Sequence, residues 1–196
     1  MFYALRNLFA LIGVVAVVFA LSAAVKMAPM MQSLDSFDEK ALSVYMDMME
    51  KIVETGNAAE ATVWKVQVNE DLTAADVEET MKFVANEHNI KNVGELPLSG
   101  QIEAMSGEKS RFLKIYMFCN ALTAAQMLEY SDAYSAYLPC RVSMVEDKQG
   151  KLWLYSLNMD AMIYGGTPLP ADLKEEAEGV KEIILDIMNR GAEGDF

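Results

Sequence analysis

The chain has 196 residues, 53% of them hydrophobic, and carries 29 acidic against 16 basic side chains, for a formal net charge of −13. This length accommodates one domain and an appendage. Nucleic-acid binding is disfavoured, because lysines and arginines that would neutralise phosphates are outnumbered. The single histidine, His88, and two cysteines supply too few ligands for a structural zinc site. We interpret His88 as a helix-end residue near free carbonyls, and the negative charge as a source of solubility.

The first segment with a clear physical signature is the uncharged apolar run over residues 8–25. A helix of this length reaches roughly 27 Å, close to the hydrocarbon thickness of a bilayer. The tripeptide SAA at residues 22–24 resembles a signal-peptide cleavage site, so removal of the segment is the alternative. Because the run exceeds the usual length of a signal sequence, we expect residues 1–27 to be a retained transmembrane anchor that crosses the lipid bilayer.

Positive charge on the two sides of this run predicts its orientation. Arg6 and the terminal amine precede the run, whereas Lys26 follows it and is itself followed by acidic residues, beginning with Asp35. We therefore expect a single-pass protein of the bacterial inner membrane, with its N-terminus in the cytoplasm and its main domain in the periplasm.

Residues 28–57 are expected to form a linker and an amphipathic stalk helix. Pro29 predicts an interruption of any helix that leaves the membrane, and Ser36 with Glu39 reads as a capping box that begins the next helix. Apolar residues then recur at helical spacing and need a partner, either the chain's own domain or another subunit. We expect the stripe to contact integral membrane protein subunits of a larger redox or metalloenzyme complex, through Phe37, Val44, Tyr45, Met48 and Ile52.

Methionines gather on both sides of Pro29 and again on the stalk helix. Thioethers are soft ligands that suit Cu(I), so a periplasmic copper-binding or copper-delivery protein is an alternative function. Methionine also fills irregular interfaces, and we interpret these clusters as packing rather than as a metal site. The copper ligands of the alternative are Met27, Met30, Met31, Met46 and Met49.

Residues 58–196 mix strand and helix patterns, which predicts an α+β fold with a small mixed sheet and helices packed on one face. The expected strands cover residues 61–68, 111–119, 138–147 and 151–157, and a hairpin turn at 147–150 joins the last two. The expected helices cover residues 73–88, 122–134 and 171–190, and Thr73 with Asp76 forms a capping box at the start of the first. The stretch 89–110 is irregular, with room for a strand and a short helix.

Cys119 ends one expected strand and Cys140 begins the next. Strand alternation places each thiol among apolar side chains, which favours packing, and directs Arg141 to the opposite face. A helix between two strands usually makes them parallel neighbours, which would separate the cysteines by roughly 20 Å, beyond the reach of a disulfide. Antiparallel strands would instead bring both cysteines to one end of the sheet, where a disulfide or a thiol redox pair becomes feasible.

Several short motifs surround these cysteines: Cys119-Asn120, the pentapeptide LPCRV at residues 138–142, Glu146-Asp147, Gly150 and Trp153. With them, the chain resembles the bacterial domain-of-unknown-function 302 family over about residues 61–190, although Ala121 stands where that family commonly has proline. The resemblance implies a small α+β domain that is often exported and often dimeric, so a homodimer through this domain is compatible with it. It implies no reaction and no catalytic residue, and we therefore expect an accessory protein and not an enzyme.

Overall fold

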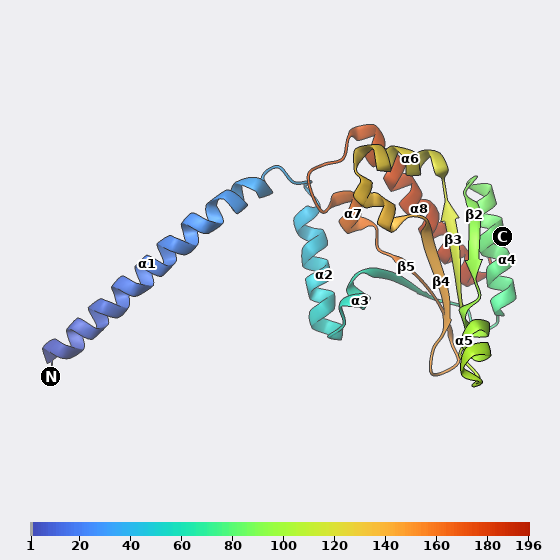
Figure 1. Ribbon diagram of the computed structural model, residues 1–196, viewed down its shortest axis with the longest axis horizontal. Helices are drawn as coiled ribbons and strands as arrows, with labels where there is room; N and C mark the ends of the chain where they lie inside the picture. Colours follow the sequence, from blue (N-terminus) through green and yellow to red (C-terminus); the bar gives the residue numbers. More distant parts are fainter. Residues whose placement is uncertain (1) are drawn as a thin grey trace.

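The structure is a computed structural model that describes residues 2–196, except for several side chains of the first helix, Met30 and Met31 among them. This helix, α1 (Phe2–Leu34), projects away from the rest of the molecule (Figure 1). Its segment Phe9–Pro29 is long and apolar enough to cross a membrane, and no part of that segment is buried against the described residues. The length and exposure of α1 fit a bilayer span or a signal sequence equally.

Pro29 lies inside α1 and does not interrupt it, so the predicted break is wrong. Proline removes one backbone donor, and the surrounding residues, mostly alanine and methionine, are good helix formers that carry the helix past that single loss. The helix ends instead at Leu34, where Phe37 donates its backbone N–H to the Leu34 carbonyl in a turn.

The stalk helix α2 (Ala41–Thr55) begins later than predicted, with Lys40 at its N-cap and no side-chain cap. The predicted capping box of Ser36 and Glu39 is therefore wrong, and Ser36 donates its hydroxyl to the Ser33 carbonyl instead. Asp38 explains the difference, because its carboxylate is buried in an ion pair with Lys174 and also accepts the Lys40 N–H. This pairing holds the segment in a turn that precedes the helix.

Five strands form one sheet in the order β1-β5-β4-β3-β2, and every neighbouring pair is antiparallel. The α+β class is confirmed. The strands are β1 (Val63–Gln67), β2 (Lys91–Leu96), β3 (Leu113–Cys119), β4 (Cys140–Glu146) and β5 (Leu152–Leu157). The helices of the domain are α3 (Ala58–Ala61), α4 (Ala74–Glu87), α5 (Leu98–Ser106), α6 (Ala121–Tyr130), the 3-10 helix η1 (Asp132–Tyr137), α7 (Asp160–Tyr164) and α8 (Ala171–Glu193).

Helices α4 and α8 lie together on one face of the sheet and enclose the main core (Figure 1). The predicted capping box at the start of α4 is confirmed, with Thr73 and Asp76 bonded reciprocally. The irregular stretch 89–110 contains β2 and α5, as its length allowed. The side chains that the two helices bury against the sheet include Tyr116, Phe118, Val142, Met144 and Leu154 from the strands, and Met81, Val84, Ile184 and Met188 from the helices.

Strands β3 and β4 are antiparallel, with Phe118 paired to Cys140, so the expected parallel crossover is wrong. The connection explains the difference. Helix α6 has 10 residues and is followed by the six residues of η1, and together they fold over one end of the sheet. A parallel crossover would have to travel the full length of a strand before β4 began. Cys119 and Cys140 are consequently at the same end of the sheet.

Candidate functional sites

The predicted contact stripe on α2 lies mostly against the chain's own domain. Val44 packs on the second core cluster, which α6, α7 and α8 build, and Met48 and Ile52 are half-buried on the same side of the helix. Tyr45 donates its hydroxyl to the Gly165 carbonyl at 2.6 Å, and Phe37 is half-buried before the helix begins. This side of α2, centred on Val44, Met48 and Ile52, is called the inner face below.

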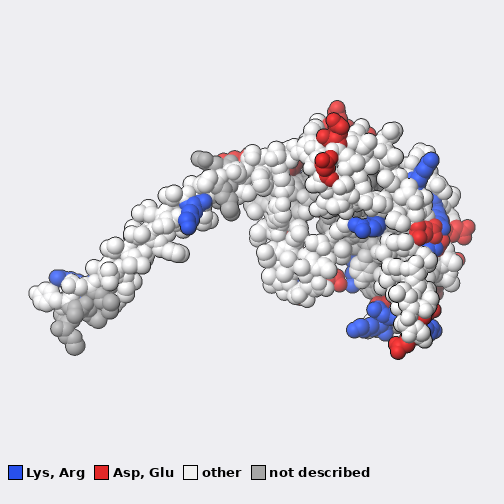
Figure 2. All heavy atoms as spheres, viewed as in Figure 1, with Lys and Arg blue, Asp and Glu red and all other residues white. Residues whose placement is uncertain are grey.

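A second apolar face of α2 is exposed. Leu42, Met46, Met49 and Val53 are 70%, 60%, 56% and 79% exposed, respectively. Their spacing of four, three and four residues places them in one line along the helix, about 120° around its axis from the inner face. Figure 2 shows that the side of α2 turned to the viewer is free of charged side chains. We call these four residues the outer stripe.

A buried ion pair attaches the start of α2 to the domain. Asp38 is 5% exposed, and its carboxylate accepts from the Lys174 ammonium on α8 at 2.6 Å. That hydrogen bond holds the pKa of Asp38 below its ordinary value, although burial acts in the opposite direction. The Asp38 N–H also donates to the Gly166 carbonyl, and the Lys40 ammonium lies 4.5 Å from the centre of the Tyr164 ring. These contacts fix the point at which α1 leaves the domain.

A cavity of about 60 Å³ lies at the end of the sheet where β3 finishes and β4 begins. Its walls come from these strands, from the α6–η1 connection, from the segment around α7 and from α8. Most of the lining is apolar, and its sulfur-bearing members are Cys119, Cys140, Met127, Met159 and Met162. These residues come from distant parts of the sequence, although the Cys119-Asn120 and LPCRV motifs both contribute to the lining.

Both cysteines are free thiols that line this cavity. Burial raises the pKa of Cys140 to about 11, with a smaller contribution from Cys119, and burial also raises the pKa of Cys119. Because the thiolate is the nucleophile in thiol chemistry, these cysteines are poorly suited to nucleophilic catalysis at neutral pH. Cys140 packs with Val142 and Met144 in the core, as strand alternation predicts, and Arg141 is exposed.

The methionines that the sequence offers as possible copper ligands are spread over two helices, α1 and α2. Met27 is exposed on α1, and Met46 and Met49 are exposed on the outer stripe of α2. The side chains of Met30 and Met31 lie outside the described residues. The Nε2 atom of His88 lies 2.7 Å from a carboxylate oxygen of Asp186, and His88 is the C-cap residue of α4. Over residues 2–196, no group of three or more His, Cys, Asp and Glu side chains is placed to hold a metal ion.

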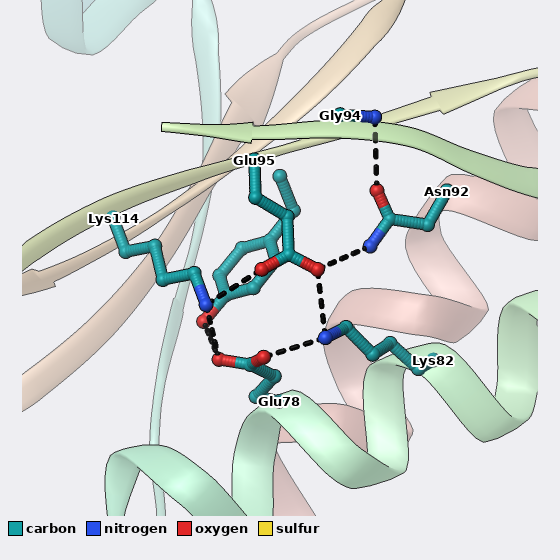
Figure 3. A network of polar contacts seen from close by, with 7 residues as sticks. Glu78, Lys82, Asn92, Gly94, Glu95 and Lys114 are labelled. Carbon is teal, nitrogen blue, oxygen red and sulfur yellow. Dashed lines mark hydrogen bonds and ion pairs between the residues drawn. The ribbon is translucent and has the colours of Figure 1, made fainter. Parts of the chain in front are cut away.

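A closed ring of four charges joins α4 to the β2–β3 edge of the sheet (Figure 3). Glu78 contacts Lys82 and Lys114 at 2.5 and 2.7 Å, and Glu95 contacts the same two lysines at 2.7 and 2.7 Å. Hydrogen bonds from the Lys114 and Lys82 ammoniums lower the pKa of Glu95 to about 2. The hydroxyl of Tyr116 donates to Glu78 at 2.8 Å. Every charge in the ring is paired, so we interpret it as structural.

Comparisons with known proteins identify the family and the fold of the domain. The family model described as domain of unknown function DUF302 matches residues 64–191, which begin in β1 and therefore exclude α1 and α2. A crystal structure of an uncharacterized conserved protein DUF302 from Bacillus stearothermophilus is similar, with a TM-score of 0.54 and 15% sequence identity. The similarity covers 66% of this chain and 97% of that chain, and at this identity it establishes the fold alone. No curated protein matches the chain.

Proposed function

The chain belongs to the DUF302 family, and we propose that this member is a membrane-anchored accessory subunit that performs no catalysis of its own. In this proposal α1 crosses the bacterial inner membrane, and the domain lies in the periplasm. The outer stripe of α2 binds an apolar helix of an integral membrane protein in a larger complex. The observation that carries the proposal is the exposure of four aligned apolar side chains on the helix that follows α1.

Exposure of the outer stripe is costly without a partner. Burying a leucine, valine or methionine side chain is worth about 1.5–3 kcal/mol relative to leaving it in water. Four such side chains in one line form an apolar surface of the kind that docks helix against helix through positions four, three and four residues apart. The stripe therefore suits a partner with its own apolar helical face.

The charge of α2 favours a protein partner over the lipid surface. Helices that lie in a membrane interface are rich in lysine and arginine on their polar face, which attracts anionic lipids. The polar face of α2 instead carries Asp47, Glu50 and Glu54 with only Lys51. An acidic helix is repelled by an anionic lipid surface, so contact with a membrane protein is the better account of its apolar stripe.

The position of α2 supports an integral membrane partner in particular. Six residues separate Leu34 at the end of α1 from Ala41 at the start of α2. Leu34 lies about 7 Å along the helix beyond Pro29, where the apolar segment ends. With the Asp38–Lys174 pair fixing the junction, α2 stays close to the point at which α1 leaves the bilayer.

The proposed orientation rests on the charges beside the span, with Arg6 before it and acidic residues soon after Lys26. Protease treatment of sealed inside-out membrane vesicles tests it. We expect the domain to be protected inside such vesicles and to be digested when the vesicles are opened. Digestion in sealed vesicles would contradict the periplasmic location.

Site-specific photo-crosslinking in native membranes tests the docking surface. A photoreactive residue at Met46 should form an adduct with one integral membrane polypeptide. The same residue at Ser43, which is exposed on the polar side of α2, serves as the matched control and should form none. Equal adducts at both positions, or adducts with lipid alone from Met46, would contradict the proposal.

A further inference from the structure

Ser156 is a buried polar residue on β5 to which the docking proposal gives no role. Among the described residues, the buried polar or charged side chains other than tyrosine are those of Asp38, Thr80, Thr123 and Ser156. The first three each form a hydrogen bond with another residue of the chain. The Ser156 hydroxyl has no partner among the described residues, although Ser156 is only 6% exposed. A buried hydroxyl without a partner destabilises a fold, so packing alone does not account for a serine at this position.

The Ser156 hydroxyl faces the cavity at the end of β3 and β4. Ser156 lines this cavity, and its pairing with the buried Val142 places its side chain on the sheet face that α4 and α8 cover. No side-chain nitrogen or oxygen atom of the described residues is both fully enclosed and unpaired. Because the Ser156 hydroxyl is unpaired, it borders open space, and the cavity supplies that space.

The walls around this hydroxyl are apolar, and small side chains leave the space between them open. Ala177 of α8 lines the cavity and is 2% exposed. Cys140 and Val180 also line it, and both pack against the two core clusters of the domain, so the cavity lies where these clusters meet. Arg141 is exposed, and strand alternation directs its side chain to the other face of the sheet. A charged ligand would lose its hydration here without gaining a counter-charge, so the walls suit an uncharged ligand.

The size and polarity of the cavity limit what it can hold. Its volume is about 60 Å³, whereas an engineered apolar cavity of about 150 Å³ in another protein binds benzene or xenon, so the ligand here is smaller than benzene. A buried water needs about two to four polar partners. Thr123 and Tyr134 also line the cavity, but both already donate their hydroxyl protons to other residues of the chain. One free buried hydroxyl, that of Ser156, suits a mostly apolar molecule better than water.

We propose that this cavity binds a small uncharged molecule that has an apolar body and one hydrogen-bonding group. The apolar body contacts the methionine and alanine side chains of the walls, and the polar group pairs with the Ser156 hydroxyl. A short-chain alcohol has this chemistry. A ligand of about four non-hydrogen atoms has a Kd no tighter than about 0.04 mM, because the binding energy available per atom has a ceiling.

Methyl NMR of the full-length protein in detergent, labelled at the methionine methyl groups, tests the site with two probes. The alcohol n-propanol carries a hydroxyl and xenon carries no hydrogen-bonding group, so the pair separates the polar contact from the apolar one. Met127, Met159 and Met162 line the cavity, whereas Met46 and Met49 are exposed on α2. We expect both probes to shift the three cavity methyl signals along saturating curves and to cause no saturable shift at the two exposed methionines.

Variants at two wall positions test the two parts of the contact. Ser156→Ala removes the hydroxyl and should weaken n-propanol binding about 3- to 10-fold, as expected for one neutral hydrogen bond, while xenon binding stays unchanged. Ser143→Ala is the matched control, because Ser143 follows Val142 on β4 and its side chain is directed to the opposite face of the sheet. Its affinities for both probes should equal those of the wild type. Ala177→Leu fills the cavity and should abolish the binding of both probes.

The absence of saturable shifts at the cavity methionines of the wild type would overturn the proposal, and this result does not depend on a variant folding. Equal n-propanol affinities of the wild type and Ser156→Ala would overturn the role of the hydroxyl and the proposed ligand class with it. A folded Ala177→Leu protein that binds xenon as the wild type does would place the binding elsewhere and would equally contradict the proposal. These measurements are independent of the α2 docking surface.

Discussion

The charge ring on α4 and the outer stripe of α2 are opposite cases. In the ring, Glu78, Glu95, Lys82 and Lys114 each find two partners of opposite charge within the chain. In the stripe, four apolar side chains stay exposed along one line of a well-formed helix. The ring is complete as the chain stands, so the fold alone accounts for it. The stripe has no such partner among the described residues 2–196, and we propose that an outside protein covers it.

Removing Asp38 should have the largest effect on stability, because its partner in the chain is specific and its carboxylate is buried. Asp38→Asn keeps the size of the side chain and leaves Lys174 without its counter-charge. We expect a loss of about 2 kcal/mol in the free energy of unfolding. This loss is smaller than the loss expected for a fully buried ion pair, because the Lys174 side chain is 27% exposed. Denaturant unfolding of the full-length protein in detergent measures it.

The control for this variant is Glu70→Gln, which removes one side of the exposed Lys151–Glu70 pair. That substitution should leave the denaturation midpoint unchanged, because exposed ion pairs contribute little. Equal losses in both variants would show that burial of Asp38 does not matter, and the account of the α1–α2 junction would then be wrong.

Glu95→Gln should have a smaller effect that depends on pH. The folded-state pKa of Glu95 is lowered to about 2, against an ordinary value of 4.5. Its contribution is therefore fully present above pH 4.5 and is lost as the pH falls from there through 2. We expect the variant to lose about 1 kcal/mol at pH 7, because the ring is partly open to solvent. In that acidic window its stability should fall less steeply than that of the wild type, by at most about 1.4 kcal/mol per pH unit.

Urea unfolding at several pH values between 2 and 7 compares the two proteins. A variant whose stability fell as steeply as that of the wild type in the acidic range would show that Glu95 does not titrate as the ring requires.

The contributions of the two faces of α2 to stability can be distinguished by making the same substitution at one methionine on each face. Met48 is half-buried on the inner face and Met46 is 60% exposed on the outer stripe, so Met48→Ala and Met46→Ala remove identical groups from one helix. We expect Met48→Ala to cost about 1 kcal/mol through lost packing and Met46→Ala to change nothing measurable. Thermal unfolding of both variants measures the difference. A larger loss from Met46→Ala would mean that the outer stripe stabilises the chain itself.

Sequence patterns predicted the structure correctly wherever the outcome depends on residues within a single helix or strand. The capping box of Thr73 and Asp76 needs only four consecutive residues, and alternation along β4 needs only the strand itself to place Cys140 beside Val142 and Met144. Expectations that depended on distant partners were wrong. The capping box predicted at Ser36 does not form, because Asp38 pairs instead with Lys174, which is 136 residues away in the sequence. The β3–β4 direction depended on where α6 and η1 pack, which periodicity does not encode.

The candidate surfaces show the same limit. Apolar residues cover more than half of the circumference of α2, so helical spacing alone does not distinguish the side that meets the domain from the side that meets a partner. The spacing of Leu42, Met46, Met49 and Val53 is readable in the sequence, but only the contact of Val44 with the domain core identifies which side is free. The cavity at the end of β3 and β4 is lined in part by the Cys119-Asn120 and LPCRV motifs, but the sequence does not show that these motifs meet α7 and α8 there, because its walls come together only in the folded chain.

The size of the native complex tests the central claim most directly. Full-length wild type, Met46→Asp and the control Ser43→Asp are extracted from native membranes in mild detergent and compared by native mass measurement. The wild type and Ser43→Asp should each have the mass of one complex that is larger than the chain alone. Met46→Asp should have the mass of the free chain, and its thermal stability should be unchanged. A Met46→Asp variant that remained in a complex of the same size would contradict docking through the outer stripe.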